Sequence, residues 1–349
     1  MSSLVSNPAY AQDKCINSQL LVASLLALFE YRQLDIEPLL KGTGIFKQDL
    51  QLNEHHISPV QLLTLVDNAL KLWPGDDLAF MLGQQWLPAQ SGSLTTGLLC
   101  SNSLSQLQRL WYKYHWLSQP WLQGWQWQTS AQQHLLLQLD IGAHRQQRFF
   151  IELALSSLVS TYKKLTHNTW QGQFSLPYPQ PQSLDQYYKY LGDKLSFSQP
   201  LCVISFDSTS NNADFEMANP QGVKQAQQRL RSQLKHSPSK IGLPGAIRWL
   251  LSRSHAAHLS LPQVAEYFGL SPATLKRRLK EYHISFQQLQ DQANMQKAIY
   301  MLAVSGESNL AVAKQLQFAD SNNFRRSFKR WTGQLPSQFK YWLSQVTPS

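Results

Sequence analysis

The 349-residue chain has only three cysteines and no apolar run long enough to cross a membrane. Cys15, Cys100 and Cys202 lie far apart, without the paired spacing of a zinc site or a disulfide framework. The early apolar run from Leu20 to Phe29 is half of the ~20 residues that a membrane helix needs. The signal-like Ala9-Tyr10-Ala11 stands before this run, which is the wrong order for secretion. We therefore predict a cytoplasmic protein without a membrane partner.

The sequence also lacks the short motifs of common catalytic sites. It contains no Gly-x-Ser-x-Gly elbow, phosphate-binding glycine loop or His-Glu-x-x-His pattern. The stretch Lys41-Gly42-Thr43-Gly44 is too short for a nucleotide loop. His55 and His56 are adjacent, and no third ligand follows at a metal spacing. We expect no catalytic residues, no cofactor and no metal, and an enzyme domain is the least favoured of the interpretations considered below.

Positive charge is abundant but unevenly distributed. The net charge is +10, and from Ile241 onward thirteen Lys and Arg face five Asp and Glu. Residues 1 to 240 carry eighteen against sixteen. A basic region beside a nearly neutral one is expected when one part of a chain neutralises phosphates. On charge alone, a merely soluble basic domain is an equally good interpretation.

Length and apolar content suit two domains rather than one core. The stretch "HSPSKIGL" interrupts the helical pattern and marks the boundary. We predict a domain over residues 1–236, with its core at about 15–214, a linker at 237–243 and a second domain over 244–343.

The first domain mixes helical and strand periodicities, so it is predicted to be α+β. Helices are expected at Leu20–Leu28, Val60–Leu72, Phe149–Leu165 and, last, Val223–Lys235. Alternation around Trp125–Thr129 and Leu135–Leu139 predicts a hairpin, and Leu201–Phe206 a further strand. The second domain shows no strand-like alternation and is predicted to be all α.

The segment 261–282 predicts a helix-turn-helix unit. Ser260 can cap the first helix with Gln263, and Gly269 can end it in a left-handed conformation. Ser271 caps the second helix, in which Leu275 and Leu279 point inward. The exposed side chains are then Ala273, Thr274, Lys276, Arg277 and Lys280. Small and hydrogen-bonding residues followed by basic ones suit a helix that reads DNA bases and holds phosphates.

The segment 310–333 predicts the same unit again. Leu310, Ala313 and Leu316 should form the apolar face of its first helix, and Asp320 should cap its second. With Phe324 and Phe328 inward, the exposed side chains are Ser321, Asn322, Arg325 and Arg326.

A helix predicted from Phe286 to Val304 joins the two units. About twenty residues at 1.5 Å each span roughly 30 Å, close to the ~34 Å of one DNA turn. One such unit alone could be an αα-hairpin with a solvated basic face. Two units joined by a rod of this length favour a tandem reader of two successive major-groove segments.

These residues resemble the AraC/XylS family of bacterial regulators over roughly Pro244 to Leu343. The segments "GLSPATLKRRLKEYHISF" and "FADSNNFRRSFKRWTGQLPSQF" carry the likeness. By position, the resemblance implies base contacts at Ala273, Lys276, Arg277, Ser321, Asn322 and Arg325. The exposed pattern adds Thr274 as a base contact, and Lys280 and Arg326 as phosphate contacts. Two positions depart from the family pattern: Gln317 replaces a usual Gly, and Asn294 a usual Arg.

The first half is similar, more loosely, to the arabinose-binding-type N-terminal domain of some of these regulators. The segments "DDLAFMLGQQ", "GLLCSNSLSQLQRLWYKYHWL" and "LDQYYKYLGDKLSFSQPLCVISFD" carry this likeness. It implies a small-molecule effector of unknown identity and a homodimer, with RNA polymerase as a further partner if the protein activates transcription.

Aromatic density between Trp111 and Trp127 suggests where an effector would bind. Trp111, Tyr114, Trp125 and Trp127 are the candidate pocket residues, because indoles and phenols can line an apolar site with polar handles. For any single one of them, an ordinary core or interface residue is the favoured interpretation. A ligand-independent architectural DNA-binding protein is the main alternative function, and an enzyme domain fused to a DNA-binding domain the more remote one.

Overall fold

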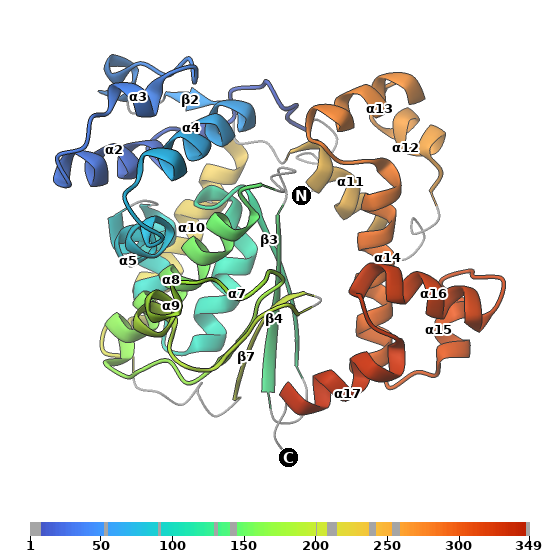
Figure 1. Cartoon of the computed structure of the whole chain (residues 1–349). Helices are drawn as coiled ribbons and strands as arrows, with labels where there is room; N and C mark the ends of the chain where they lie inside the picture. The colour runs from blue at the N-terminus through green and yellow to red at the C-terminus, as the bar shows by residue number, and fades with distance from the viewer. Residues whose placement is uncertain are drawn as a thin grey trace.

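The computed structural model describes residues 8–51, 55–89, 92–128, 132–139, 145–199, 201–207, 215–236, 242–252 and 259–346. It confirms the predicted fold class: an α+β N-terminal region is followed by an all-helical C-terminal region (Figure 1). The segment predicted as a linker at 237–243 lies mostly outside the described residues.

The N-terminal region begins with small elements and helices that pack around one apolar core. The short strands β1 (Ile16–Asn17) and β2 (His56–Ile57) pair antiparallel. The other elements of this part are α2 (Val22–Tyr31), α3 (Glu37–Leu40), the 3-10 turn η1 (Lys47–Gln51), α4 (Pro59–Leu72), α5 (Leu78–Ala89), α6 (Ser93–Leu99), α7 (Leu104–Tyr114) and the 3-10 turn η2 (His115–Leu117).

A five-stranded sheet follows, and three helices interrupt or succeed it. The strand order is β3-β4-β7-β5-β6, and all neighbours are antiparallel except β5 and β6. The predicted hairpin is confirmed, with Trp125 opposite Leu136 and Trp127 opposite His134. The elements are β3 (Leu122–Gln128), β4 (Gln132–Leu139), α8 (Gln147–Thr166), β5 (Gln173–Ser175), α9 (Leu184–Leu191), β6 (Leu195–Ser196), β7 (Cys202–Asp207) and α10 (Pro220–His236).

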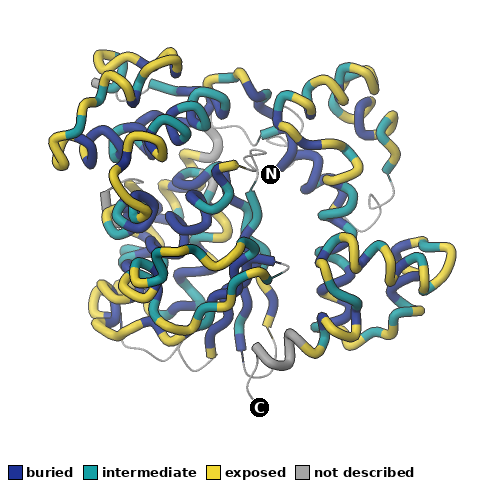
Figure 2. The backbone as a smooth tube through the Cα atoms, viewed as in Figure 1, coloured by how far each residue is buried: buried dark blue, intermediate teal, exposed yellow. Residues whose placement is uncertain are grey.

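The two faces of the sheet pack against different parts of the chain, because successive strand residues point to opposite faces. Leu135, Leu137 and Ile204 belong to the core of the N-terminal helices. Leu136 and Val203, on the other face, share a core with the C-terminal helices. The sheet is thus covered on both sides, and β4 and β7 are buried along most of their length (Figure 2).

The described residues of the C-terminal region form seven helices arranged around two small cores. One core gathers α11, α12, α13 and the start of α14, and the other gathers the end of α14 with α15, α16 and α17. The helices are α11 (Leu243–Ser252), α12 (Leu261–Tyr267), α13 (Pro272–Glu281), α14 (Phe286–Ala303), α15 (Asn309–Gln315), α16 (Ser321–Thr332) and α17 (Pro336–Val346). Helix α14 therefore links the two units, as the sequence predicts.

Polar contacts also tie the C-terminal helices to the N-terminal region. The Gln296 side-chain amide on α14 donates to Gln138 Oε1 on β4 at 2.8 Å. The Arg248 guanidinium on α11 donates to the Leu139 carbonyl at 3.3 Å. Near the chain start, the Tyr282 hydroxyl donates to the Ala9 carbonyl at 2.8 Å. These contacts flank an apolar interface, so the two regions form one packed body.

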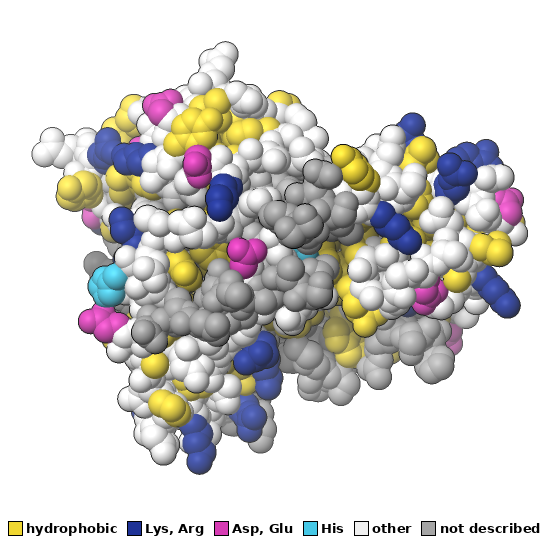
Figure 3. Space-filling model, turned by 90° about the horizontal axis from the view of Figure 1, so that it is seen from below, with side chains coloured by type: hydrophobic (Ala, Val, Ile, Leu, Met, Phe, Trp, Pro, Cys, Tyr) yellow, Lys and Arg dark blue, Asp and Glu magenta, His cyan; other side chains and the backbone are white. Residues whose placement is uncertain are grey.

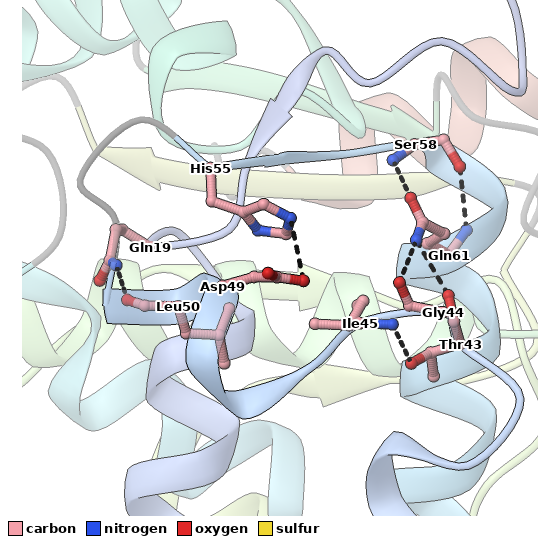
Figure 4. Close-up of polar contacts among 9 residues, drawn as sticks. All are labelled: Gln19, Thr43, Gly44, Ile45, Asp49, Leu50, His55, Ser58 and Gln61. Atoms are coloured by element: carbon pink, nitrogen blue, oxygen red, sulfur yellow. Dashed lines mark hydrogen bonds and ion pairs between the residues drawn. The ribbon is translucent and has the colours of Figure 1, made fainter.

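The Lys41–Gly44 stretch and the histidine pair that begins at His55 contact neighbouring polar side chains (Figure 4). The Gln61 amide donates to the carbonyls of Thr43 and Gly44 at 3.0 and 3.2 Å, so the loop is tied to α4. His55 lies 3.9 Å from Asp49. No group of three His, Cys, Asp or Glu side chains gathers at a metal-binding distance within the described ranges. In the same part of the chain, no helix is both long and apolar enough to span a membrane.

Candidate nucleic-acid interface

The first helix-turn-helix unit forms from the residues predicted to form it. The Ser260 backbone N–H and hydroxyl both donate to Gln263 Oε1 at 2.8 Å, at the start of α12. The Ser271 hydroxyl accepts from the Thr274 N–H at 3.1 Å and so caps α13. Leu275 and Leu279 are fully buried beneath α13. The opposite face of α13 is therefore free to present its polar residues.

The exposed face of α13 carries the side chains assigned to DNA. Ala273, Lys276, Arg277 and Lys280 are exposed, and Thr274 is half-buried. The Thr274 hydroxyl shares a 2.9 Å hydrogen bond with the Ser271 hydroxyl, so it takes part in the cap. A groove of about 640 Å³ beside α13 is lined by Lys276, Lys280 and His283, among others.

The second unit repeats this construction. Asp320 accepts from the Asn323 N–H at 2.7 Å and caps α16, while Phe324 and Phe328 are fully buried. Asn322, Arg325 and Arg326 are exposed and Ser321 is half-buried. The Arg326 guanidinium donates to Asn323 Oδ1 at 2.5 Å, so it is held close to the start of α16.

One residue of the second unit is not where the sequence placed it. Leu310 was expected on the apolar face of α15, but its side chain is 69% exposed. The buried residues are Val312, Ala313 and Leu316. The reason is geometric: α15 is only two turns long, and at 100° per residue Leu310 lies more than 90° from the centre of the Val312–Leu316 face.

The two departures from the family pattern have visible consequences. Gln317 has a φ of 56°, so the left-handed turn is kept without a glycine. That conformation costs a residue with a Cβ roughly 1 kcal/mol. Asn294 Oδ1 is buried and has no hydrogen-bond partner among the described residues. The second unit is therefore the less favourably built of the two.

Basic side chains on α13 and α16, the second helix of each unit, can bind a negatively charged partner. In the described part of the chain, no carboxylate forms an ion pair with Lys276, Arg277 or Arg325, whereas Arg278 and Arg330 pair with Glu281 and Asp291. Basic side chains are visible on the lobe made by the C-terminal helices and also on the larger N-terminal part (Figure 3). Both units lie on the side of α14 away from the sheet, so docking on the sheet leaves them accessible (Figure 1).

The four aromatic residues proposed for an effector pocket do not line one cavity. Trp111 lines a cavity between α7 and the sheet, and Tyr114 is fully buried but is not among its lining residues. Trp125 and Trp127 lie on the other face of the sheet, against the C-terminal helices. Their odd positions on β3 place them there, because Leu122 and Gly124 face the N-terminal helices.

Two features of this region were missed by the reasoning from sequence. Gln108 and Trp86 line the cavity beside Trp111, and nothing in their sequence spacing connects them. Arg330 crosses to Asp291 on α14 at 2.9 Å and braces the second unit against the connecting helix. Both features depend on tertiary packing, which cannot be predicted from a single sequence.

The geometry defines a tandem helix-turn-helix protein with an α+β domain in front. Comparison with known families supports a narrower assignment: the arabinose-binding domain of AraC transcription regulators matches residues 34–213. A helix-turn-helix domain model matches residues 264–341. Since the first match alone covers more than half of the chain, the chain belongs to the AraC family of transcription regulators.

Individual relatives are more distant. The chain is 30% identical over 163 residues to the ornithine utilization regulator of Pseudomonas aeruginosa, covering 47% of this chain and 48% of that one. It is 25% identical over 190 residues to the HTH-type transcriptional regulator VqsM of the same organism, covering 54% of each. The matches thus span about half the length of these relatives. The crystal structure of transcriptional regulator CdpR from P. aeruginosa is similar at a TM-score of 0.44 and 15% identity, covering 92% of this chain and 97% of that chain.

Proposed function

We propose that this protein is a sequence-specific regulator that grips two successive major-groove segments of double-stranded DNA. The observation that carries the proposal is the pair of capped second helices, α13 and α16, each with an apolar face buried and a basic face exposed. Helix α14 links them and spans roughly 27 Å at 1.5 Å per residue. That length suits contacts about one helical turn of DNA apart.

Roles within each helix follow from position. The N-terminal residues of a recognition helix face base edges. Ala273, Thr274, Lys276 and Arg277 take this role on α13, and Ser321, Asn322 and Arg325 take it on α16. Lys280 and Arg326 lie further along and hold phosphates, which supply affinity without sequence preference.

A selection experiment tests the proposal directly. Full-length protein would be mixed with a pool of random duplexes, and the bound fraction sequenced after several rounds. We expect enrichment of two short motifs separated by about one helical turn, roughly 10 base pairs. Enrichment of a single motif would limit reading to one unit. A pool that stays random while binding falls steeply with salt would support the architectural alternative.

We further propose that residues 1–236 form an effector-binding and dimerisation domain, and that 244–343 form the DNA-binding domain, with 237–243 as linker. The two family matches, over residues 34–213 and 264–341, support this division. Sedimentation of the full chain at micromolar concentration should give a homodimer, and a fragment over 241–349 should be a helical monomer that binds DNA more weakly. A monomeric full chain would remove avidity from the mechanism.

Activation or repression is decided by the position of bound sites relative to promoters. Mapping those sites across the genome of the source organism would show which genes are controlled and suggest the chemistry of the effector. Contact with RNA polymerase is a proposal that applies only to an activator. Loss of regulation without loss of DNA binding, in variants of the exposed Leu310, would support such a contact.

A further inference from the structure

A cavity lies inside the N-terminal domain, between the sheet and helices α5, α6, α7 and α8. It measures about 60 Å³, and its lining includes Trp86, Gln108, Trp111, Leu135, Leu137 and Ala154. A water molecule needs about 10–15 Å³ of such a space. The cavity therefore has room for roughly four to six non-hydrogen atoms before any side chain moves.

Two hydrogen-bond donors in this lining have no acceptor in the part of the chain that the structure describes. The side-chain amide nitrogen of Gln108 and the indole nitrogen of Trp86 are both buried, and no partner for either lies among the described residues. The two side chains are 6% and 2% exposed. Buried donors are paired in nearly all proteins, because an unpaired one loses its hydrogen bonds to water without replacement. The pair therefore points to an acceptor that enters the cavity.

The lining also excludes charged ligands. Its remaining residues are apolar or carry hydroxyl and amide groups, and none of the described lining residues is Asp, Glu, Lys, Arg or His. A carboxylate, phosphate or ammonium group would lose its hydration here without gaining a counter-charge. A free amino acid or a sugar phosphate does not fit this site.

We propose that this cavity is the effector site and that it takes a small, uncharged, mostly apolar molecule with a carbonyl-type oxygen. That oxygen accepts hydrogen bonds from Gln108 and Trp86, while the rest of the molecule contacts Leu135, Leu137 and Ala154. The inference names a ligand class for the effector domain of the proposed function. Occupancy of the cavity itself does not depend on DNA binding.

Strand β4 connects this site to the C-terminal helices. Leu135 and Leu137 line the cavity, and Leu136 between them packs on the opposite face with the core that includes Ile299 of α14. Gln138 on the same strand accepts the hydrogen bond from Gln296. A ligand wedged between α7 and β4 therefore acts on the strand to which the DNA-binding helices dock.

Binding can be tested with model compounds on the full-length protein without DNA. The probes are 2-pentanone and butanoate, which both have six non-hydrogen atoms but differ in charge. Saturation-transfer NMR titrations give a Kd for each. We expect saturable binding of 2-pentanone and none of butanoate over the same concentrations. Absent ketone binding, or butanoate binding of equal affinity, would overturn the proposal.

Substitutions of the lining residues test whether the ketone binds in this cavity. Gln108→Leu and Trp86→Phe each remove one donor and should weaken ketone binding roughly 2- to 12-fold, the range for one neutral hydrogen bond. Ala154→Leu fills the cavity and should abolish binding. Gln108→Leu is the safest of the three for folding, since an apolar group of similar size replaces an unpaired donor. Unchanged ketone affinity in folded Gln108→Leu and Ala154→Leu proteins would place the ketone elsewhere and refute the site.

DNA binding by the same variants separates this inference from the proposed function. If no variant or wild-type protein selects a DNA sequence but the ketone binds as described, the proposed function fails and the ligand site stands. If DNA selection succeeds and ketone binding fails, only the ligand site is lost.

Discussion

Gln317 adopts nearly the same left-handed conformation as Gly269, with φ values of 56° and 65° at the turns of the two helix-turn-helix units. At Gly269 an added Cβ would meet no neighbouring atom within 4 Å, so the cost of a side chain there is conformational. The two turns share a geometry, but only the first has the residue that adopts it without strain.

Replacing the strained residue should stabilise the second unit. Gln317→Gly is expected to raise the free energy of unfolding by about 1 kcal/mol, because glycine removes the Cβ from a left-handed turn. Gly269→Ala should lower it by a similar amount. Urea unfolding followed by circular dichroism would measure both. Lys314→Gly, in the last turn of α15, is the control and should cost up to about 1 kcal/mol. A loss of stability for Gln317→Gly as well would show that turn strain does not decide the outcome.

His134 should make the protein less stable in acid. It is 1% exposed, stacks on Trp127 with ring centroids 5.0 Å apart, and its Nδ1 lies 2.8 Å from the Ser205 hydroxyl. Burial lowers the pKa of His134 to about 4, against about 6.5 in an unfolded chain. The unfolded state thus binds a proton first, so this contribution is full above pH 6.5 and is lost as the pH falls toward 4.

The size of that loss is up to about 3 kcal/mol across the window. His134→Gln keeps a group that can bond to Ser205 but does not titrate, so its stability should fall less between pH 7 and pH 4.5 than that of the wild type. Denaturant unfolding at several pH values gives the difference, in which the other histidines cancel. Parallel pH profiles for the two proteins would mean that His134 is protonated as easily in the folded state as in the unfolded one.

The free energy of unfolding should depend on the partners of a buried carboxylate, that of Glu152 on α8. Glu152 is 4% exposed, and its carboxylate accepts hydrogen bonds from Arg148, at 2.6 Å, and from the Tyr187 hydroxyl. Burial raises the pKa of Glu152, and Arg148 opposes that rise. Removing the guanidinium leaves a buried negative charge with one partner fewer.

Arg148→Met is therefore expected to lower the free energy of unfolding by about 2 to 3 kcal/mol at pH 7. This is the lower part of the range for a broken buried ion pair, because the Arg148 side chain is 40% exposed. An acid with a raised pKa is favoured in the folded state at low pH, and that advantage is lost as the pH rises through the folded pKa. The destabilisation should thus shrink near pH 5. The double variant Arg148→Met, Glu152→Leu should recover most of the loss, and a loss as large as that of the single variant would show that the carboxylate is not its source.

Local signals predicted the C-terminal region well because its helices are specified by residues close in sequence. Ser271 and Asp320 form caps as expected, and Leu275 and Phe324 are buried as expected. Leu310 was placed wrongly because a two-turn helix has too few residues to define a face. The separation of Trp111 from Trp127 could not be predicted, since it depends on what covers each face of the sheet. The unpaired donors at Gln108 and Trp86 come from different helices, and only packing brings them together.

The exposed basic residues could contact either bases or phosphates. Mutation of a base contact changes sequence preference, whereas mutation of a phosphate contact weakens binding to all sequences. Arg277 is exposed and unpaired on α13 in the described part of the chain, where a guanidinium can bond to a guanine edge. Arg277→Ala should cost roughly 1 to 3 kcal/mol at the selected site and relax the preference at one base pair. Non-specific affinity should fall less.

Lys280→Ala and Arg326→Ala should instead weaken all duplexes alike and reduce the magnitude of the log-affinity against log-salt slope by about one. Because the second unit carries the strained Gln317 turn, Arg277→Ala should cost more affinity than Arg325→Ala. Titrations of each variant against selected and scrambled duplexes at two salt concentrations separate these effects. If Arg277→Ala changed the salt slope and left the base preference intact, Arg277 would be a phosphate contact, and base reading by α13 would have to come from Ala273, Thr274 and Lys276.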